Sequence, residues 1–399
     1  DLVGAELATE LERLQADGPA DPPEEVRARV EAELGQPLET VFRDFEDRPL
    51  ASASIAQVHA ARLAGGERVV LKLRHRGVSD RVRVDLAILG DLVSLAERVP
   101  DFAAYRPRRV YQEFRRTLLR ELDLSLELAH MRRIAEIFRA QSQIRVPKAY
   151  PQFSTRRLLT MERLEGVRVN DLTALRASGL DLDALARRGA EMYMEMILGH
   201  GFYHADPHPG NLLVLPDGAI GLLDYGMVGR LDEQSRDDIE ALMLAVIDQD
   251  AAAMAEVVLR LSRAPADLDR GELAWDLDEL VAGSLHQPVE HFDMSGALGA
   301  LLELVRGYRL VLPGEIALLI KVLVMLEGTG RQLSPSFSLI EAMKPYRRRL
   351  LARRASPPRQ LRRLLRFGQD LDRFLGQLPA SLNEALERMR SGRFYMRMD

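Results

Sequence analysis

The chain has 399 residues, of which 47% are hydrophobic, enough to build two or three compact units around a large buried core. The absence of cysteine excludes disulfide bonds, and a net charge of −5 gives no overall bias towards nucleic acid or membrane. No stretch resembles a signal peptide, and the longest apolar run, residues 316–326, is interrupted by Lys321 and falls well short of the roughly 20 residues that span a bilayer.

The front of the chain predicts a helical extension over residues 1–45. Leucines at helical spacing indicate an amphipathic helix over residues 2–15, which Asp17-Gly-Pro19 ends. A second helix is predicted over residues 24–34, up to Gly35. We expect this extension to pack on the body of the protein.

From residue 50 the pattern changes to β-strand. Residues 55–63 and 68–73 alternate in polarity and are joined by Gly65-Gly66, a pair suited to a tight hairpin. Only four of the 55 basic residues are lysines, so Lys72 in mid-strand indicates a position that needs a compact ammonium. The small residues at 51–56, considered alone, predict no more than a strand of small side chains.

Two long helices and two further strands are predicted next. The helices cover residues 85–97 and 109–139, where Leu, Ile and Phe recur at spacings of three and four. The strands cover residues 144–150 and 156–163 and are expected to extend the same sheet.

The second half of the chain is predicted to be mainly helical. A helix over residues 181–199 leads into a loop-rich segment, and residues 232–345 contain no convincing strand. Trp275 and the helix of residues 316–326 are expected in the core of this helical region.

Residues 200–230 carry most of the chemical information. Apolar runs at residues 212–215 and 220–223 flank a Pro-Asp-Gly turn and predict a β-hairpin. Asp206 and Asn211 precede the hairpin and Asp224 ends it.

This arrangement of polar residues fits phosphoryl transfer. The reaction needs an acid that orients the attacking hydroxyl and oxygen ligands that hold Mg²⁺ on the phosphates. Asp-x-x-x-x-Asn, a hairpin and Asp-aromatic-Gly supply all three at the spacing of protein kinases, with Asp206 as the base and Asn211 and Asp224 as metal ligands.

Two other interpretations of the segment are open. Asp, Asn, Pro and Gly are ordinary turn formers, so the hairpin could be a surface feature with solvated acids, although a carboxylate directly after Leu222-Leu223 is awkward without a partner. Histidines at 200, 204 and 208 have the spacing of a helical zinc site, but Pro207 and Pro209 break any helix there.

The motif His204-Ala-Asp-Pro-His-Pro-Gly-Asn211, with Leu223-Asp-Tyr-Gly-Met-Val-Gly229, resembles the signature of the UbiB-like (AarF-type) atypical kinases, a family tied to isoprenoid-quinone biosynthesis. The likeness spans roughly residues 7–345. Its other motifs are Leu50-Ala-Ser-Ala-Ser-Ile-Ala-Gln-Val-His59, Val69-Val-Leu-Lys-Leu73, Glu121-Leu-Asp123 and the helical stretch of residues 312–328.

The resemblance implies an α+β, two-lobed protein-kinase-like fold. A small β-containing N-lobe with inserted helices is expected over residues 46–166, and a mostly helical C-lobe with the catalytic loop over residues 167–345. A basic helical tail is expected over residues 346–399.

The resemblance also implies roles for particular residues. Lys72 is expected to pair with Glu127 and face the phosphates of ATP or ADP, bound with Mg²⁺ or Mn²⁺. Glu121 and Asp123 are expected to face the metal side or an N-terminal motif. The loop over the phosphates is Ala51, Ser52, Ala53, Ser54, Ile55 and Ala56, and the hinge that contacts adenine is Met161, Glu162 and Leu164 within residues 161–166.

The sequence departs from the family pattern in several places. The family's Lys-x-Gly-Gln motif and hydrophobic C-terminal anchor are absent, which predicts a soluble core cut from a longer protein. Ser52 replaces a loop alanine, Ala56 a usual glycine and Tyr225 the usual phenylalanine, changes that bear on nucleotide preference more than on fold.

Arginine accumulates near the end of the chain, with nine between Arg347 and Arg366. Interleaved leucines fit a segment on an anionic membrane surface. The family resemblance implies a cytoplasmic protein that is held at the inner membrane when full-length and has a prenylated lipid as substrate. Nucleic acid is the weaker option because aromatic residues are scarce there. A plain arginine-rich surface is an equal alternative.

Two functions compete. The first is an atypical kinase or ATPase that uses Mg²⁺ and adenine nucleotide in isoprenoid-quinone biosynthesis, ubiquinone or menaquinone-type. The second is a nucleotide-gated chaperone or scaffold for a lipid-biosynthetic complex, without phosphoryl transfer. A conventional protein kinase is disfavoured by the alanine-rich loop and the proline-rich catalytic loop.

Overall fold

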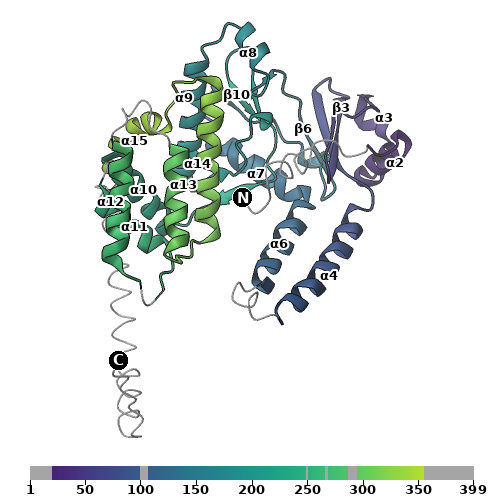
Figure 1. The fold of residues 1–399 in the computed structure, drawn as a ribbon. Coiled ribbons are helices and arrows are strands. Elements are labelled where there is room, and N and C mark those ends of the chain that lie inside the picture. Colours follow the sequence, from purple (N-terminus) through teal and green to yellow (C-terminus); the bar gives the residue numbers. More distant parts are fainter. Residues whose placement is uncertain (1–19, 99–106, 249, 266–267, 286–293, 355–399) are drawn as a thin grey trace, which may run out of the picture. The chain divides into compact units, whose positions relative to one another are not determined.

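A computed structural model describes residues 20–98, 107–248, 250–265, 268–285 and 294–354. The chain divides into two compact units, residues 1–342 and 343–399, of which the second is described only up to Arg354. The predicted helix over residues 2–15 and most of the predicted basic tail therefore lie outside the described residues. Figure 1 shows the course of the chain.

An antiparallel sheet of five strands forms the N-lobe, in the order β1-β3-β4-β6 with β2 on β3. The Gly65-Gly66 turn closes the β3–β4 hairpin, and Gly66 has a φ of 95° that a side chain would resist. The strands are β1 (Phe42–Phe45), β2 (Ala51–Ser52), β3 (Ala56–Leu63), β4 (Arg68–Arg74) and β6 (Leu158–Glu162). Residues 42–45, expected within a helical extension, are thus a strand of the sheet.

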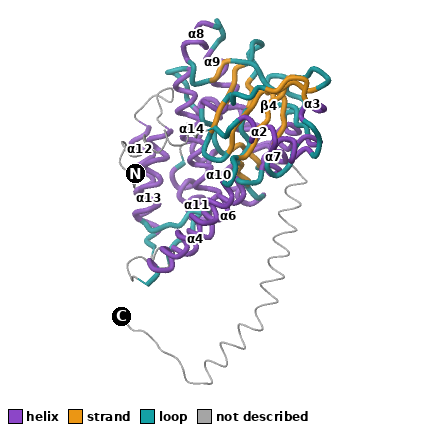
Figure 2. Tube along the Cα trace, turned by 90° about the vertical axis from the view of Figure 1, so that its right-hand side faces the viewer, coloured by secondary structure: helices purple, strands orange, loops and turns teal. Residues whose placement is uncertain are grey.

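One face of this sheet is covered by α2 (Pro23–Leu34) and α3 (Leu38–Val41). Val26 and Val30 of α2 are buried against strand residues that include Leu71 and Leu73. Burial of such side chains is worth roughly 1.5–3 kcal/mol each, so the front helix is an integral part of the lobe. Figures 1 and 2 place α2 beside the sheet.

Among the described residues, three α-helices lie between β4 and β6 along the chain. They are α4 (Val78–Ala96), α6 (Pro107–Glu121) and α7 (Leu124–Ile137). The prediction of one continuous helix over residues 109–139 is wrong, because the chain breaks at Leu122-Asp123 and Asp123 caps α7 by accepting the Ser125 amide at 3.0 Å. The chain changes direction at this break, and α7 packs against β6.

The entrance to the C-lobe is built from two small sheets. One has the order β5-β10-β9-β7 and the other pairs β11 with β8. Of residues 144–150, predicted as a strand of the N-lobe, only Ile144 and Arg145 form a strand, β5, which runs parallel to β10, and Ala149 makes a single bridge to Met161 of β6. The strands are β5 (Ile144–Arg145), β7 (Val167–Arg168), β8 (Phe202–His204), β9 (Leu212–Val214), β10 (Ile220–Leu222) and β11 (Val228–Arg230).

The rest of the C-lobe is helical, as predicted, and Figure 2 shows its helices in purple. Buried Ile316, Leu319 and Val322 confirm that α14 lies in the core. Trp275, predicted in the core, is 72% exposed, because Leu273 and Leu277 occupy the buried face of its helix. The elements are α8 (Leu172–Ala177), α9 (Leu182–Met194), η2 (Glu195–His200), α10 (Glu233–Asp248), α11 (Ala251–Leu261), α12 (Arg270–Leu285), α13 (Met294–Gly307), α14 (Gly314–Leu333) and α15 (Leu339–Arg354), with short turns η1 (Pro151–Phe153) and η3 (Pro209–Asn211).

None of the helices in the described part of the chain is long and apolar enough to cross a bilayer.

Candidate active site

A buried ion pair joins the N-lobe sheet to helix α7. The Lys72 ammonium on β4 donates to both carboxylate oxygens of Glu127 at 2.9 Å. Glu127 is only 4% exposed, and Lys72 lies between Val58 of β3 and Leu159 of β6. The pairing expected from the sequence is therefore present, while its role at a nucleotide stays a prediction.

The same ammonium reaches the C-lobe hairpin. Lys72 donates to Asp224 at 3.0 Å, and the second Asp224 oxygen accepts the Gly226 amide at 2.7 Å. Burial alone would raise the pKa of Asp224, but Lys72 and the Gly226 amide outweigh it and hold that pKa at about 2. Burial alone would likewise lower the pKa of Lys72, yet the two carboxylates raise it. Both groups are thus held in their charged forms, one ammonium between two carboxylates from distant segments.

Asp206 and Asn211 meet on the loop between β8 and β9. The Asn211 side-chain amide donates to the Asp206 carboxylate at 2.8 Å. The loop is pinned to the hairpin because the Leu223 amide donates to the Asn211 carbonyl at 3.0 Å. The hairpin itself agrees with the prediction, with β9 and β10 joined by a turn in which Gly218 has a φ of 77°.

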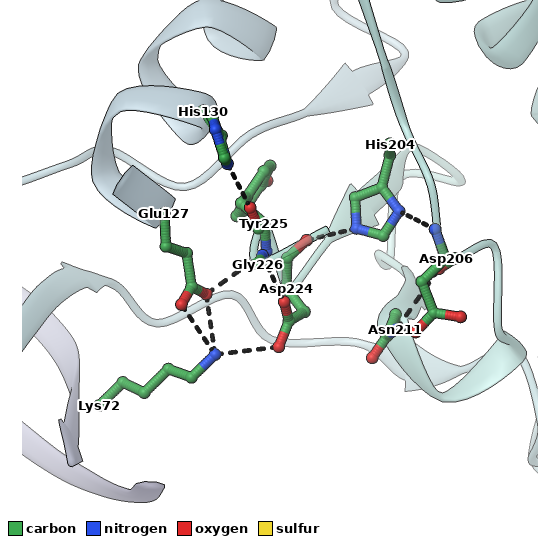
Figure 3. Close-up of polar contacts among 9 residues, drawn as sticks. All are labelled: Lys72, Glu127, His130, His204, Asp206, Asn211, Asp224, Tyr225 and Gly226. Carbon is green, nitrogen blue, oxygen red and sulfur yellow. Dashed lines mark hydrogen bonds and ion pairs between the residues drawn. The ribbon is translucent and has the colours of Figure 1, made fainter. Parts of the chain in front are cut away.

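His204 links the loop that carries Asp206 to Asp224 (Figure 3). Its Nδ1 accepts the Asp206 amide at 3.1 Å, so its other nitrogen, Nε2, must donate to the Asp224 carbonyl. Only the neutral ring can make both contacts, and burial accordingly lowers the pKa of His204. The four residues Lys72, Asp224, Asp206 and Asn211 thereby belong to one connected hydrogen-bond network.

A second histidine holds the Asp-Tyr-Gly segment from the other side. His130 of α7 donates from Nδ1 to the Tyr225 carbonyl at 3.0 Å. Tyr225 is fully buried, and its hydroxyl, which a phenylalanine would lack, donates to the Leu222 carbonyl at 2.9 Å. Neither His130 nor the role of His204 was predicted, because the carbonyls they contact leave no mark in the sequence.

The neutral state of His204 has a consequence for stability. A histidine whose pKa is lower in the folded than in the unfolded chain stabilises the fold fully only above about pH 6.5, and this stability is lost as the pH falls further. We expect the free energy of unfolding in urea to fall below pH 6.5, by up to about 1.4 kcal/mol per pH unit for this one group.

The substitution His204→Gln should make that pH dependence shallower, although the protein will be less stable at pH 7.5. His200→Gln, a change at a histidine that lies more open to solvent, serves as the control and should keep the wild-type slope. Parallel slopes for wild type and His204→Gln would show that the ring does not stay neutral in the fold.

The loop predicted to cover the phosphates is a tight hairpin between β2 and β3. Ala51 and Ser52 pair with Val58 and Gln57, and the Ala53 amide donates to the Ala56 carbonyl at 2.9 Å. Because Val58 is also the neighbour of Lys72, the loop adjoins the strand that carries the ammonium.

The predicted hinge follows the last strand of the N-lobe sheet. Met161 and Glu162 end β6, where they pair with Val70 and Val69, and Leu164 belongs to the connection into the C-lobe. This connection ends at Gly166, which lies so close to the Val214 backbone that no side chain would fit. The hinge is thereby held against the hairpin that follows Asn211 and leads to Asp224.

The two acids of the Glu-x-Asp motif have different surroundings. Burial raises the pKa of Glu121, and the charge of Asp224 adds to the rise while that of Lys72 opposes it. The expected orientation of Glu121 towards a metal stays a prediction. Asp123 is the cap of α7 and pairs with Arg156 at 3.5 Å. These two contacts are structural, and a role of Asp123 towards a metal or an N-terminal motif stays a prediction.

The donor set suits a magnesium ion held mainly by a nucleotide. In the described ranges no group of three His, Cys, Asp or Glu side chains could hold a metal ion alone. The side-chain oxygen of Asn211 has no hydrogen-bond partner among the described residues, and the Asp224 carboxylate is 42% exposed. One amide and one carboxylate oxygen fit Mg²⁺, which takes few protein ligands and completes its shell with phosphates and water.

Comparison with known proteins identifies two domains in the chain. Residues 13–258 match the family described as the ABC1 atypical kinase-like domain, and residues 277–338 match the UbiB helical domain. The first match covers the N-lobe and all the residues of the ion network, and the second covers much of the remaining helical region.

Similar proteins extend over most of the chain. A probable protein kinase UbiB from Shewanella loihica is 34% identical over 364 residues, 90% of this chain and 66% of its own length. One from Pseudomonas aeruginosa is 33% identical over 394 residues, 98% of this chain and 73% of its own length. The chain thus spans about two thirds to three quarters of these relatives.

A solved structure has the same fold. The complex of Rv3197 with erythromycin from Mycobacterium tuberculosis superposes with a TM-score of 0.60, covers 82% of this chain and 83% of its own, and is 21% identical. The likeness confirms the two-lobed kinase-like fold that the sequence predicted. By its sequence and its domains, the chain belongs to the UbiB family of ABC1-type atypical kinases.

Proposed function

We propose that the protein binds an adenine nucleotide with Mg²⁺ between its lobes and transfers or hydrolyses the terminal phosphoryl group. The observation that carries this proposal is the position of Lys72, whose ammonium contacts Glu127 of α7 and Asp224 of the hairpin at 2.9 and 3.0 Å. A strand lysine paired with a helix glutamate is the arrangement that active protein kinases use to hold the α- and β-phosphates.

Each residue of the network has a task in this proposal. Lys72 orients the phosphates as a point charge, with Glu127 as its fixed partner. Asn211 and Asp224 hold the magnesium ion, which when bound neutralises charge on the phosphates. Asp206 accepts the proton of the attacking hydroxyl or water, and Asn211 keeps its carboxylate in position.

The proposed setting is isoprenoid-quinone biosynthesis, ubiquinone or menaquinone-type, at a membrane. Support comes from the family to which the chain belongs and from its relatives, which are named probable protein kinases UbiB. The arginine-rich stretch from Arg347 to Arg366 is the proposed contact with anionic lipid, and its residues after Arg354 lie outside the described part of the chain. A prenylated lipid is the proposed acceptor class.

Binding of Mg-nucleotide tests the proposal directly. Titration with a fluorescent ADP analogue should give saturable binding that Mg²⁺ strengthens. Asp224→Asn should weaken the magnesium-dependent binding roughly thirtyfold or more, since it removes the only charged side chain from the proposed pair of metal ligands. Asp44→Asn, at a surface acid whose side chain is 68% exposed, is the control and should bind like wild type. If wild type and Asp224→Asn bind Mg-nucleotide equally, the proposed site is wrong.

A further inference from the structure

His75 connects the chain ahead of α2 to the loop over the phosphates. The residue follows β4 and is 6% exposed. Its Nε2 lies 2.9 Å from the Ala53 carbonyl oxygen and 3.4 Å from the Ser52 hydroxyl, and its Nδ1 lies 3.3 Å from the Asp21 carboxylate. The Ala53 carbonyl oxygen can only accept, so Nε2 donates to it, while Nδ1 faces the Asp21 carboxylate.

Asp21 is itself fixed by several contacts. Its carboxylate accepts Arg29 at 2.7 Å and the Arg76 amide at 3.2 Å, while its own amide donates to Gln57 at 2.9 Å. These partners lie on α2, at the end of β4 and on β3. Asp21, the partner of His75, is therefore held in place by the packed N-lobe.

The contact at Ala53 determines which way the loop amides face. No peptide bond among the described residues is cis, so the Ala53 carbonyl and the Ser54 amide point in opposite directions. With the carbonyl turned towards His75, the Ser54 amide is turned away from it. Within the described residues neither the Ser54 nor the Ile55 amide has a hydrogen-bond partner.

The position of His75 relative to the sheet shows which way the Ser54 amide faces. Side chains alternate along a strand, so His75 continues the face of Leu73, which packs under α2, whereas Lys72 lies on the opposite face. An amide turned away from His75 is consequently turned towards the Lys72 face, where an anionic ligand would lie.

We propose that His75 is a positioning residue that, braced by Asp21, holds the Ala53 carbonyl on the outer side so that the Ser54 amide can donate to a nucleotide phosphate. The inference rests on the proposed function for the identity of the ligand. It adds a route by which the chain ahead of α2 controls nucleotide affinity from the far face of the sheet.

Substitutions at position 75 test whether His75 acts as a hydrogen-bond donor to Ala53 or only fills space in the packed lobe. His75→Ala should weaken Mg-ADP binding roughly tenfold, the effect of losing one hydrogen bond of this kind. His75→Gln, whose amide can still reach Ala53, should recover most of that loss, whereas the shorter His75→Asn should not. His59→Ala is the matched control, because His59 is an equally buried histidine of the same sheet that contacts Glu46 instead of the loop.

Two further measurements make the outcome decisive. If Asp21 acts through His75, Asp21→Ala should weaken binding in the wild-type background but add nothing to His75→Ala. Amide hydrogen exchange of residues 51–56 without nucleotide should be faster in His75→Ala than in His59→Ala.

Equal affinity and equal loop exchange in His75→Ala and His59→Ala would overturn the inference, as would a His75→Gln protein no better than His75→Asn. A wild-type protein that binds no Mg-nucleotide would instead refute the proposed function. Loop exchange would then still decide whether His75 holds Ala53.

Discussion

Replacement of Asp206 by asparagine is expected to slow nucleotide turnover by about 10²–10⁴-fold while Mg-nucleotide binds with nearly wild-type affinity. The amide has the size of the carboxylate and can still accept the Asn211 side chain, so the loop should keep its conformation. What it cannot do is take the proton of the attacking hydroxyl. Turnover is measured as ADP release at saturating nucleotide, and affinity by titration with a fluorescent analogue.

Asp217→Asn is the matched control, because Asp217 lies in the turn of the same hairpin and its carboxylate accepts the Ala219 amide. It should leave turnover unchanged. Undiminished turnover in Asp206→Asn would contradict the role of Asp206 as base. A further outcome is that Asp206→Asn loses turnover and still supports the growth of cells that lack the native protein. That result would show that nucleotide binding alone is the function, as in the scaffold alternative.

The second large effect is expected at Lys72. Lys72→Met leaves the Glu127 carboxylate, 4% exposed, without its ammonium, and breaking a buried pair in this way costs on the order of 3 kcal/mol of stability. The double variant Lys72→Met/Glu127→Leu should regain most of that stability, because two apolar side chains replace the pair. Neither variant should bind Mg-nucleotide.

Urea unfolding and nucleotide titration together check this prediction. Lys321→Met, at an exposed lysine of α14, is the control and should change neither quantity. A Lys72→Met protein as stable as wild type would mean that Glu127 does not depend on the ammonium. A double variant that bound nucleotide normally would remove Lys72 from the site.

The residues that the structure brings together in the ion network could largely be picked out from the sequence because their signals are local. The hairpin has strand runs, a Pro-Asp-Gly turn and polar residues at fixed offsets, and each of these leaves a mark in the sequence. Lys72 was conspicuous as one of only four lysines. Its partner Glu127 came from the family's motif spacing, since periodicity alone cannot choose among the acids of a helix.

The features that were missed depend on contacts between distant segments. His130 and His75 bind backbone carbonyls far away in the chain, which no spacing reveals. The helix break at Asp123 was hidden because leucines on both sides keep a helical period, and capping by an aspartate competes with that pattern. Trp275 was misplaced because size and apolarity alone do not say which face of a helix is buried.

Because the Lys72 ammonium contacts Asp224, it would compete with a divalent cation for the Asp224 carboxylate. An ion arriving alone would have to displace an ammonium held 3.0 Å from the carboxylate and would find little else to coordinate it. A cation that arrives with a polyphosphate meets a different balance, because the phosphates offer the displaced ammonium a new counter-charge. If the proposed function holds, loading of the site is an exchange of ionic partners that favours the metal–nucleotide complex over either component by itself.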